Sequence, residues 1–252
     1  MDSRKNQITL LTTLILIFLT LNYSYFDKTL EEILSTDKFV TVTRIVDGDT
    51  VVVDGNTTIR LLGINCPERG EKYYDEAKIF LNESILNKNV RLEFGKDKYD
   101  RYDRVLAYVF IGSENINLEL VRNGFANYYF PSGEDKYFLL FENAWRECLE
   151  NEINLCEKSN EKCAECVKLT EFDYKKDKVV FYNKCAFACD LNGWKVKDEG
   201  RKDFLFEKFV LESFSKVELT NENFSEEYVW TDTGDTLFLR DDEGKLVLWE
   251  GY

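Results

Sequence analysis

The chain has 252 residues, of which 44% are hydrophobic, and this allows one large domain or two small domains with a buried core. It contains no histidine, which excludes catalysis by a histidine base. Its net charge of −14 disfavours nucleic-acid binding by the chain as a whole, because phosphates repel acidic surfaces. Most of the acid surplus lies in the second half: residues 38–146 carry 15 basic and 17 acidic side chains, and residues 147–252 carry 15 and 25. The charge therefore allows a phosphate site in the first half.

Residues 1–26 have the pattern of a signal peptide or an N-terminal membrane anchor. Arg4 and Lys5 precede an apolar run from Ile8 to Leu21, and neither an Ala-x-Ala cleavage site nor a lipobox cysteine follows. A buried helix is a third alternative, because the run is short for a full span. We expect an extracytoplasmic protein, secreted or anchored to a membrane by this segment.

Residues 38–150 have the pattern of a small barrel with helices. Strands rich in Val, Ile and Thr are predicted at 38–46, 50–54, 57–64, 89–97 and 104–111. Asp54 and Gly55 predict a hairpin turn. Helices are predicted at 72–88, 115–124 and 133–153, the last after a cap at Ser132. Five strands with a helix between the third and the fourth is the order of an OB-type barrel with about three helices.

The stretch "RIVDGDTVVVDGNTTIRLLGINCPE" gathers acids and an arginine at the ends of predicted strands. Phosphodiester hydrolysis needs an activated water, cations that offset the developing charge, and groups that position the phosphate. Carboxylates at Asp49 and Glu68 supply a base and hard oxygen ligands, and the fork of Arg60 matches phosphate oxygens. We therefore predict a metal-assisted phosphodiesterase site.

Each residue also has a structural interpretation. An acid before or after glycine is often a turn former, which applies to Asp47 and Asp49. Glu68 follows a proline and is also typical of the start of a helix. An arginine inside an apolar strand needs a buried partner, so Arg60 is harder to explain structurally.

Five motifs resemble, in order and spacing, the thermonuclease family of staphylococcal-nuclease-like proteins. They are "VDGDT", "IRLLGINCPE", "EAKIFL", "DRYDRVLAYVF" and "LELVRNGFA", and the resemblance covers residues 39–150. It implies an OB-like barrel and a sugar-nonspecific endonuclease that cleaves DNA and RNA with calcium.

The resemblance also implies a metal site. Asp49 matches the family's calcium carboxylate, Asn65 falls where the family often has a second calcium-binding Asp, and Cys66 would offer its backbone carbonyl. Asn65 keeps an oxygen ligand but loses one negative charge, so we expect weaker calcium binding, with magnesium or manganese as alternatives.

For catalysis, the resemblance assigns Glu68 to the attacking water and assigns Arg60 and Arg104 to the phosphate and its transition state. Asp103 departs from the family, which usually has Gly before the second arginine, and it either aligns Arg104 or partly cancels its charge.

For the substrate, Tyr128 or Tyr129 would stack on a base or touch a phosphate. Lys98 and Arg101, with Lys96, form either a solvated face or a contact to the nucleic-acid backbone.

Six cysteines remain besides Cys66. Outside the cytoplasm they favour three disulfides, while Cys163-x2-Cys166 followed by Cys185-x3-Cys189 is also close to a structural zinc site; reduced thiols are the third alternative. Three of the six, Cys156, Cys163 and Cys166, fall in residues 151–175, which we predict to be a Cys-rich linker.

Residues 176–252 are predicted to be all β, with strands at 178–182, 193–198, 204–211, 215–220, 227–231, 235–241 and 245–252. "LNGWKVKDEG" and "YVWTDTGDTLFLRDDEGKLVLWEGY" resemble the lamin-tail family, which implies an immunoglobulin-like β-sandwich. We expect core or near-core positions for Trp194, Phe204, Phe206, Leu237, Leu239 and Trp249. We expect this domain to anchor, to bind a partner or to position the nuclease.

Three functions follow as hypotheses. The first is an exported or membrane-tethered metal-dependent nuclease acting on DNA or RNA. The second is a catalytically weak or inactive binding module, motivated by Asn65 and Asp103. The third is a surface protein in which the C-terminal sandwich is the main actor.

Overall fold

The computed structural model describes residues 38–252 and, before them, Thr12, Thr13, Phe18, Thr20 and Asn22. The predicted signal or anchor at 1–26 therefore lies largely outside the described residues. Among those that are described, no helix is both long enough and apolar enough to cross a membrane.

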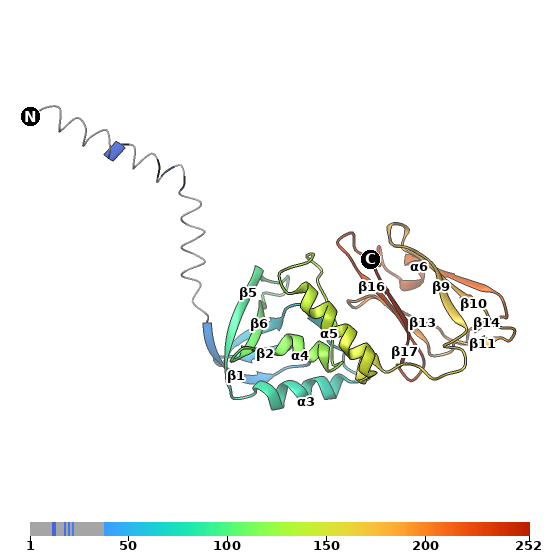
Figure 1. Cartoon of the computed structure of the whole chain (residues 1–252), viewed down its shortest axis with the longest axis horizontal. Helices are drawn as coiled ribbons and strands as arrows, with labels where there is room; N and C mark the ends of the chain where they lie inside the picture. The colour runs from blue at the N-terminus through green and yellow to red at the C-terminus, as the bar shows by residue number, and fades with distance from the viewer. Residues whose placement is uncertain (1–11, 14–17, 19, 21, 23–37) are drawn as a thin grey trace, which may run out of the picture. The chain divides into compact units, whose positions relative to one another are not determined.

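Five antiparallel and parallel strand pairings close the first half into a barrel (Figure 1). The sheet order is β3-β2-β1-β5-β6, and a parallel pairing of β3 with β6 joins the two edges, with Ile59 opposite Val105. The strands are β1 (Lys38–Ile45), β2 (Thr50–Val53), β3 (Thr57–Leu61), β5 (Asn89–Tyr99) and β6 (Val105–Ile111). The predicted OB-type barrel is confirmed.

The turn chemistry of the sequence explains this order. Asp54 and Gly55 adopt positive φ values of 46° and 87° between β2 and β3, as a tight Asp-Gly hairpin requires. Three two-residue strands complete the first half: β7 (Glu114–Asn115) extends the sheet next to β6, and β4 (Ile64–Asn65) pairs with β8 (Asn127–Tyr128).

Three helices bury apolar faces in the same core as the barrel strands. They are α3 (Tyr74–Ile85), α4 (Ile116–Arg122) and α5 (Phe138–Asn151). The last begins later than predicted, and Ser132 is not its cap. Instead Asp135 accepts hydrogen bonds from the backbone N–H of Tyr137 (2.8 Å, Oδ1) and from the hydroxyl of Tyr108 (2.6 Å, Oδ2), which holds the chain in a turn before the helix.

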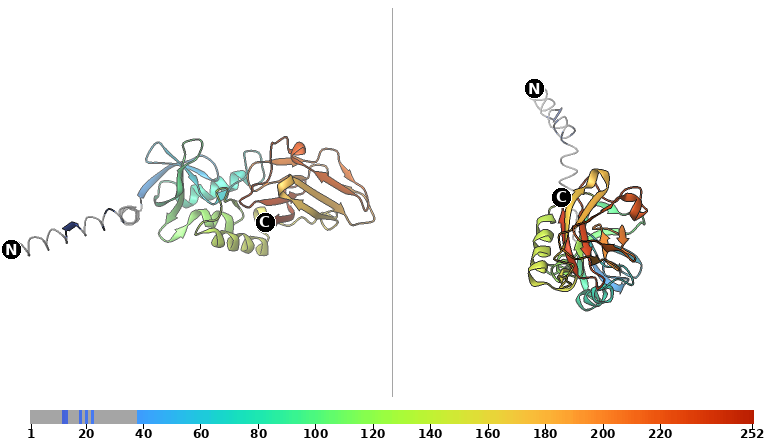
Figure 2. Two further views of the ribbon diagram at one scale, coloured as in Figure 1. Left: turned by 90° about the horizontal axis from the view of Figure 1, so that it is seen from above. Right: turned by 90° about the vertical axis from the view of Figure 1, so that its right-hand side faces the viewer.

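The second half forms a β-sandwich around its own core, and in the left view of Figure 2 its yellow to red strands form a separate group. One sheet has the order β15-β10-β9, another β13-β12-β16-β17, and β11 pairs with β14. The bounds are β9 (Val167–Asp173), β10 (Lys178–Asn183), β11 (Cys189–Asp190), β12 (Lys195–Lys197), β13 (Asp203–Leu205), β14 (Val210–Leu211), β15 (Lys216–Leu219), β16 (Thr236–Arg240) and β17 (Leu246–Gly251). Helix α6 (Asn221–Phe224) and the 3-10 turn η2 (Tyr174–Lys176) lie between these strands, and the 3-10 turn η1 (Asn154–Cys156) lies before β9.

Two expectations about this half differ from the structure. Within the predicted linker 151–175, residues 167–173 form strand β9, which pairs with β10 along its whole length. The predicted strand at 227–231 is absent, because the N–H groups of Val229 and Trp230 donate to the Asp177 carboxylate (2.8 and 3.0 Å) instead of to a neighbouring strand.

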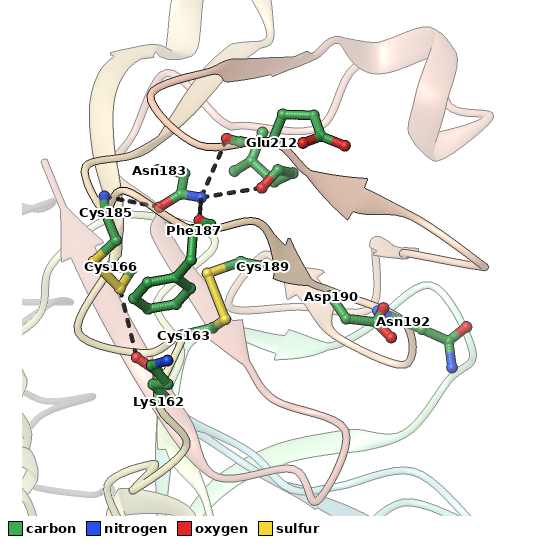
Figure 3. Close-up of a disulfide and its surroundings, with 11 residues drawn as sticks. Lys162, Cys163, Cys166, Asn183, Cys185, Phe187, Cys189, Asp190, Asn192 and Glu212 are labelled. Carbon is green, nitrogen blue, oxygen red and sulfur yellow. Dashed lines mark hydrogen bonds between the residues drawn. A yellow bond between two sulfur atoms is a disulfide. The ribbon is translucent and has the colours of Figure 1, made fainter.

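All six of the remaining cysteines form disulfides. Cys148 pairs with Cys156, and Figure 3 shows the other two bridges, Cys163–Cys189 and Cys166–Cys185. Beside them, the buried amide of Asn183 donates to the carbonyls of residues 187, 211 and 212 and so fixes the loop around Cys185. These pairings use all four thiols that the zinc alternative needs, so the structure supports the disulfide alternative.

The barrel half and the sandwich share part of one core. The Trp145 ring on α5 lies edge-on to Phe238 (5.7 Å between centroids) and to Trp249 (6.5 Å), both from the sandwich. Residues 39–252 accordingly form one compact unit. Trp249, expected in or near the sandwich core, packs partly against the barrel core instead.

Candidate active site

The site begins at the turn between β1 and β2, where Asp49 is held beneath the barrel rim. A Cβ placed on Gly48 would lie 2.8 Å from the Cβ atoms of both Ala77 and Cys66, so only glycine lets this turn approach α3 so closely. Asp49 is buried, and its Oδ1 accepts from Thr50 Oγ1 (3.0 Å) while its Oδ2 accepts from the backbone N–H of Cys66 (3.2 Å). The carboxylate is therefore fixed in one orientation.

Arg60 on β3 is the buried partner of this carboxylate. Its Nη2 lies 3.0 Å from Asp49 Oδ2, and its Nη1 donates to the carbonyls of Leu61 (2.7 Å) and Ile64 (3.0 Å). Asp49 is thus the buried partner that the sequence predicted for Arg60.

The Asn65 side chain also contacts Nη2 of Arg60. Its Oδ1 lies 3.3 Å from Arg60 Nη2, and its Nδ2 donates to the carbonyl of Gly200 in the sandwich (2.8 Å). Asp49 and Asn65 therefore turn two oxygen atoms towards the same atom, Nη2 of Arg60. Hard oxygens are the ligands that calcium or magnesium prefers, so a metal ion held by both would take the place of this guanidinium nitrogen.

These two side chains are a small ligand set. In residues 38–252 and at the five earlier described positions, no group of three or more acidic, cysteine or histidine side chains is arranged to hold a metal ion. A bound cation would need further oxygens from water, backbone or substrate phosphate, which is common for magnesium and frequent for calcium.

Arg104, which directly precedes β6, extends the hydrogen-bonded cluster formed by Asp49, Thr50, Arg60 and Asn65. Its Nη1 lies 3.4 Å from Thr50 Oγ1, and its Nε donates to Asp100 Oδ2 at 2.6 Å. Asp103 adopts a φ of 59°, the left-handed region where the family's glycine would sit. The acid that aligns Arg104 is therefore Asp100, while Asp103 serves the turn.

Glu68 is not part of this hydrogen-bond network. Its Oε1 forms an ion pair with Arg201 Nε of the sandwich at 2.7 Å, and its backbone N–H donates to Glu71 (2.8 Å). The carboxylate is 49% exposed, so water reaches it directly.

Asp47 and Cys66 flank the cluster. Asp47 accepts from the N–H of Asp49 (3.2 Å), and burial, followed by the charge of Asp49, raises its pKa. Burial, followed by the charge of Asp49, also raises the pKa of the Cys66 thiol, so the thiol stays protonated at neutral pH. The proposed role of the Cys66 carbonyl stays a prediction.

The aromatic residues are placed differently from expectation. Tyr128 is only 8% exposed, and its ring lies edge-on to Phe138 and Trp145, which disfavours stacking on a base; its contact with substrate stays a prediction. Tyr129 is half-buried, and burial, followed by the charge of Asp198, raises its pKa. In contrast, Tyr102 is 57% exposed and its ring lies under both Arg101 (4.8 Å) and Arg104 (5.4 Å).

The exposed cations Lys98 and Arg101 lie at the end of β5: Lys98 is within the strand and Arg101 follows it. Lys98 lies over the Tyr99 ring at 5.5 Å, and Arg101 shares Tyr102 with Arg104. A base-sized aromatic surface edged by cations is typical of single-strand binding.

Five contributors to this cluster were not predicted. Thr50 connects Arg104 to Asp49, and Asp100 holds Arg104 through its Nε. Asp100 and Tyr102 lie inside the motif "DRYDRVLAYVF", which offered a signal for both. Gly200 and Arg201 come from a loop far along the chain, for which the sequence of the barrel half gives no signal.

Comparison with known proteins agrees with this geometry. Residues 58–155 match the family of staphylococcal nuclease homologues, and residues 160–252 match the Lamin Tail Domain. The chain is 34% identical over 126 residues to the "Thermonuclease" of Staphylococcus intermedius, covering 46% of this chain and 75% of that protein. It is 34% identical over 123 residues to the "Thermonuclease" of Staphylococcus hyicus (45% and 73%) and 36% identical over 138 residues to an "Uncharacterized endonuclease" of Haemophilus influenzae (53% and 71%). These similarities support a nuclease, and the chain belongs to the family of staphylococcal nuclease homologues, here followed by a lamin-tail domain.

Proposed function

We propose that the chain is a divalent-metal-dependent endonuclease that hydrolyses phosphodiester bonds of DNA or RNA. The observation that carries this proposal is the convergence of Asp49, Arg60 and Arg104 on one hydrogen-bonded cluster through Thr50. Two guanidinium groups beside a fixed carboxylate suit a phosphate with a bound cation.

The protein's own residues would act in three ways. Glu68 accepts a proton from a water molecule that attacks phosphorus, the phosphorus–oxygen bond on the opposite side breaks, and the leaving oxygen takes a proton from solvent water to become a hydroxyl. Arg104 donates hydrogen bonds to the phosphate oxygens as negative charge grows on them, and Arg60 does so after exchanging its contacts to Asp49 and Asn65 for these oxygens. Tyr102 offers a stacking surface to a base next to the reacting phosphate, with little sequence preference.

Asp49 and Asn65 would hold the metal ion, which we propose to be calcium, with magnesium or manganese as alternatives. When bound, such an ion neutralises phosphate charge and lowers the pKa of a coordinated water. With a carboxylate and an amide instead of two carboxylates, we expect weaker calcium binding than in relatives that have two acids.

We also propose that the protein works outside the cytoplasm. Three disulfides support this, because thiols in most cytosolic proteins are kept reduced. The sandwich would position the nuclease or bind a partner. Fractionation of expressing cells, with mass spectrometry of unreduced protein, tests the location and the three disulfides. Reduced protein in the cytosolic fraction would contradict both.

The test of function is cleavage of a labelled oligonucleotide by three proteins: wild type, Glu68→Gln and Arg104→Ala. We expect each variant to lose activity by about a hundredfold to a thousandfold or more. Arg122→Ala, which removes an arginine paired with Glu147 on the helical side, is the matched control and should keep activity. Wild-type activity in both site variants would reject the assigned roles.

A second candidate function rests on contacts that already engage two site residues, Asn65 and Glu68. Asn65 donates to Gly200 and Glu68 pairs with Arg201, so both are engaged by the sandwich. This favours a module that binds nucleic acid without turnover. Binding of a single strand by folded protein, with no cleavage in calcium, magnesium or manganese, distinguishes it from the enzyme.

A further inference from the structure

The loop between β12 and β13 of the sandwich is fixed against the nuclease site. Within the loop, the backbone N–H of Asp198 donates to the Lys202 carbonyl (3.0 Å), and the Asp198 carboxylate accepts from the N–H of Lys202 (2.9 Å). Two amides of the barrel half hold it from outside: Asn127 donates to the carbonyl of Glu199 (2.9 Å) and Asn65 to that of Gly200 (2.8 Å). The next residue, Arg201, is therefore carried to Glu68 on a rigid support.

Arg201 keeps most of its hydrogen-bonding capacity. Only its Nε is engaged, by Glu68 Oε1, and within residues 38–252 neither of its terminal nitrogens has a hydrogen-bond partner. Arg60, in contrast, uses both terminal nitrogens on Asp49, Asn65 and two backbone carbonyls.

The pair with Glu68 is easily exchanged. Arg201 is 55% exposed and Glu68 is 49% exposed, and ion pairs of this exposure contribute only about 0–1 kcal/mol. Two lysines of the sandwich, in contrast, already share a carboxylate of the barrel half. The Nζ atoms of Lys195 and Lys197 lie 3.4 and 3.1 Å from carboxylate oxygens of Glu71.

We infer that Arg201, supplied by the lamin-tail domain, is a substrate-binding residue of the nuclease site and takes a phosphate of the bound strand beside Glu68. A guanidinium with two free terminal nitrogens matches two phosphate oxygens. Exchange of Arg201 from Glu68 to phosphate leaves the Glu68 carboxylate free at the moment when substrate is present. This inference rests on the proposed nuclease function, and it makes the sandwich part of the site.

The test compares Arg201→Ala and Arg201→Lys with wild type in two assays on the full chain. The first is fluorescence anisotropy of a labelled oligothymidylate in EDTA across a range of KCl concentrations, which measures binding without turnover. The second is steady-state cleavage with a divalent metal, which separates kcat from KM. Lys158→Ala is the matched control, because it removes one positive charge from a pair of the same length (2.7 Å) and similar exposure (59% and 52%).

We expect Arg201→Ala to bind about tenfold more weakly, with a salt slope smaller by about 0.7, which corresponds to one lost phosphate contact on a single strand. KM should rise more than kcat falls, Arg201→Lys should recover part of the affinity, and Lys158→Ala should change neither slope nor KM.

An unchanged affinity and slope in Arg201→Ala would overturn the inference while leaving the nuclease function standing. Faster cleavage with unchanged binding would also overturn it, because Arg201 would then only restrain Glu68. Arg201-dependent binding in a wild-type protein that cleaves nothing would support the inference and reject the enzyme function.

Discussion

Arg60 Nη2 lies 3.0 Å from Asp49 Oδ2, and both side chains are buried. Each charge therefore depends on the other, because a buried charge without a partner is strongly unfavourable. The pair sits where the β1–β2 turn meets β3, so it joins the barrel's structure to its chemistry.

Removal of this arginine should cost both stability and activity. Arg60→Ala leaves Asp49 buried without its cation, and we expect a loss of about 3–5 kcal/mol in the free energy of unfolding, measured by urea denaturation in EDTA. Calcium should restore part of this stability to the variant, because a cation bound at Asp49 replaces the lost charge. Equal destabilisation with and without calcium would show that Asp49 does not hold the metal.

Asn65→Asp should strengthen metal binding and weaken the contact to the sandwich. A second carboxylate should lower the calcium concentration at half-maximal activity by about tenfold. The variant also loses the donor to the Gly200 carbonyl, which should destabilise the metal-free protein by about 1–3 kcal/mol. Isothermal titration calorimetry measures the first effect and denaturation in EDTA the second; an unchanged calcium affinity would remove Asn65 from the ligand set.

Tyr102, rather than Tyr128, should be the stacking residue. Tyr102→Ala should weaken single-strand binding by about 1–3 kcal/mol, while Tyr102→Phe, which keeps the ring, should bind nearly as wild type. Anisotropy with oligonucleotides of different sequence checks this, and the effect should be similar for all of them. Loss of binding in Tyr102→Phe would show that the hydroxyl, not the ring, makes the contact.

The stability of the protein should fall as the pH rises from neutral towards 9. Burial, followed by the charge of Asp235, raises the pKa of Asp198 to about 7 and that of Glu199 to about 9, against roughly 4 in an unfolded chain. The folded protein thus holds protons that the unfolded chain has released, so this contribution is full below about pH 4 and is lost as pH rises through the folded values.

Glu199→Gln isolates this effect, because it keeps a neutral side chain of the same size. In the wild type, each pH unit within the window should cost up to about 1.4 kcal/mol for a fully titrating carboxyl. The variant's melting temperature should fall much less between pH 6 and pH 9 when followed by circular dichroism. Parallel profiles for the two proteins would show that Glu199 is ionised in the folded state.

Local patterns in the sequence predicted the barrel well. Alternating β-branched residues and the Asp54–Gly55 turn give β1 to β3, and the motifs place Asp49, Arg60 and Arg104 at neighbouring strand ends, where the structure brings them together. These features depend on residues close in the chain or on one sheet register.

Other features depend on contacts that no local pattern encodes. The pairs Glu68–Arg201 and Asn65–Gly200 join the two halves of the chain, and Tyr128 is buried because the sandwich and α5 pack on it. The apolar stretch around Trp230 resembled a strand, but its backbone bonds to Asp177 instead.

The most direct measurement is a titration of calcium, magnesium and manganese into wild-type protein and Asp49→Asn, with cleavage of a labelled single strand as the readout. We predict no cleavage in chelator, saturable cleavage by the wild type with at least one of the three ions, and a large loss of activity and metal affinity in the variant. Folded wild-type protein that cleaves nothing with any of them, or that cleaves equally well in chelator, would contradict a metal-dependent nuclease site at Asp49.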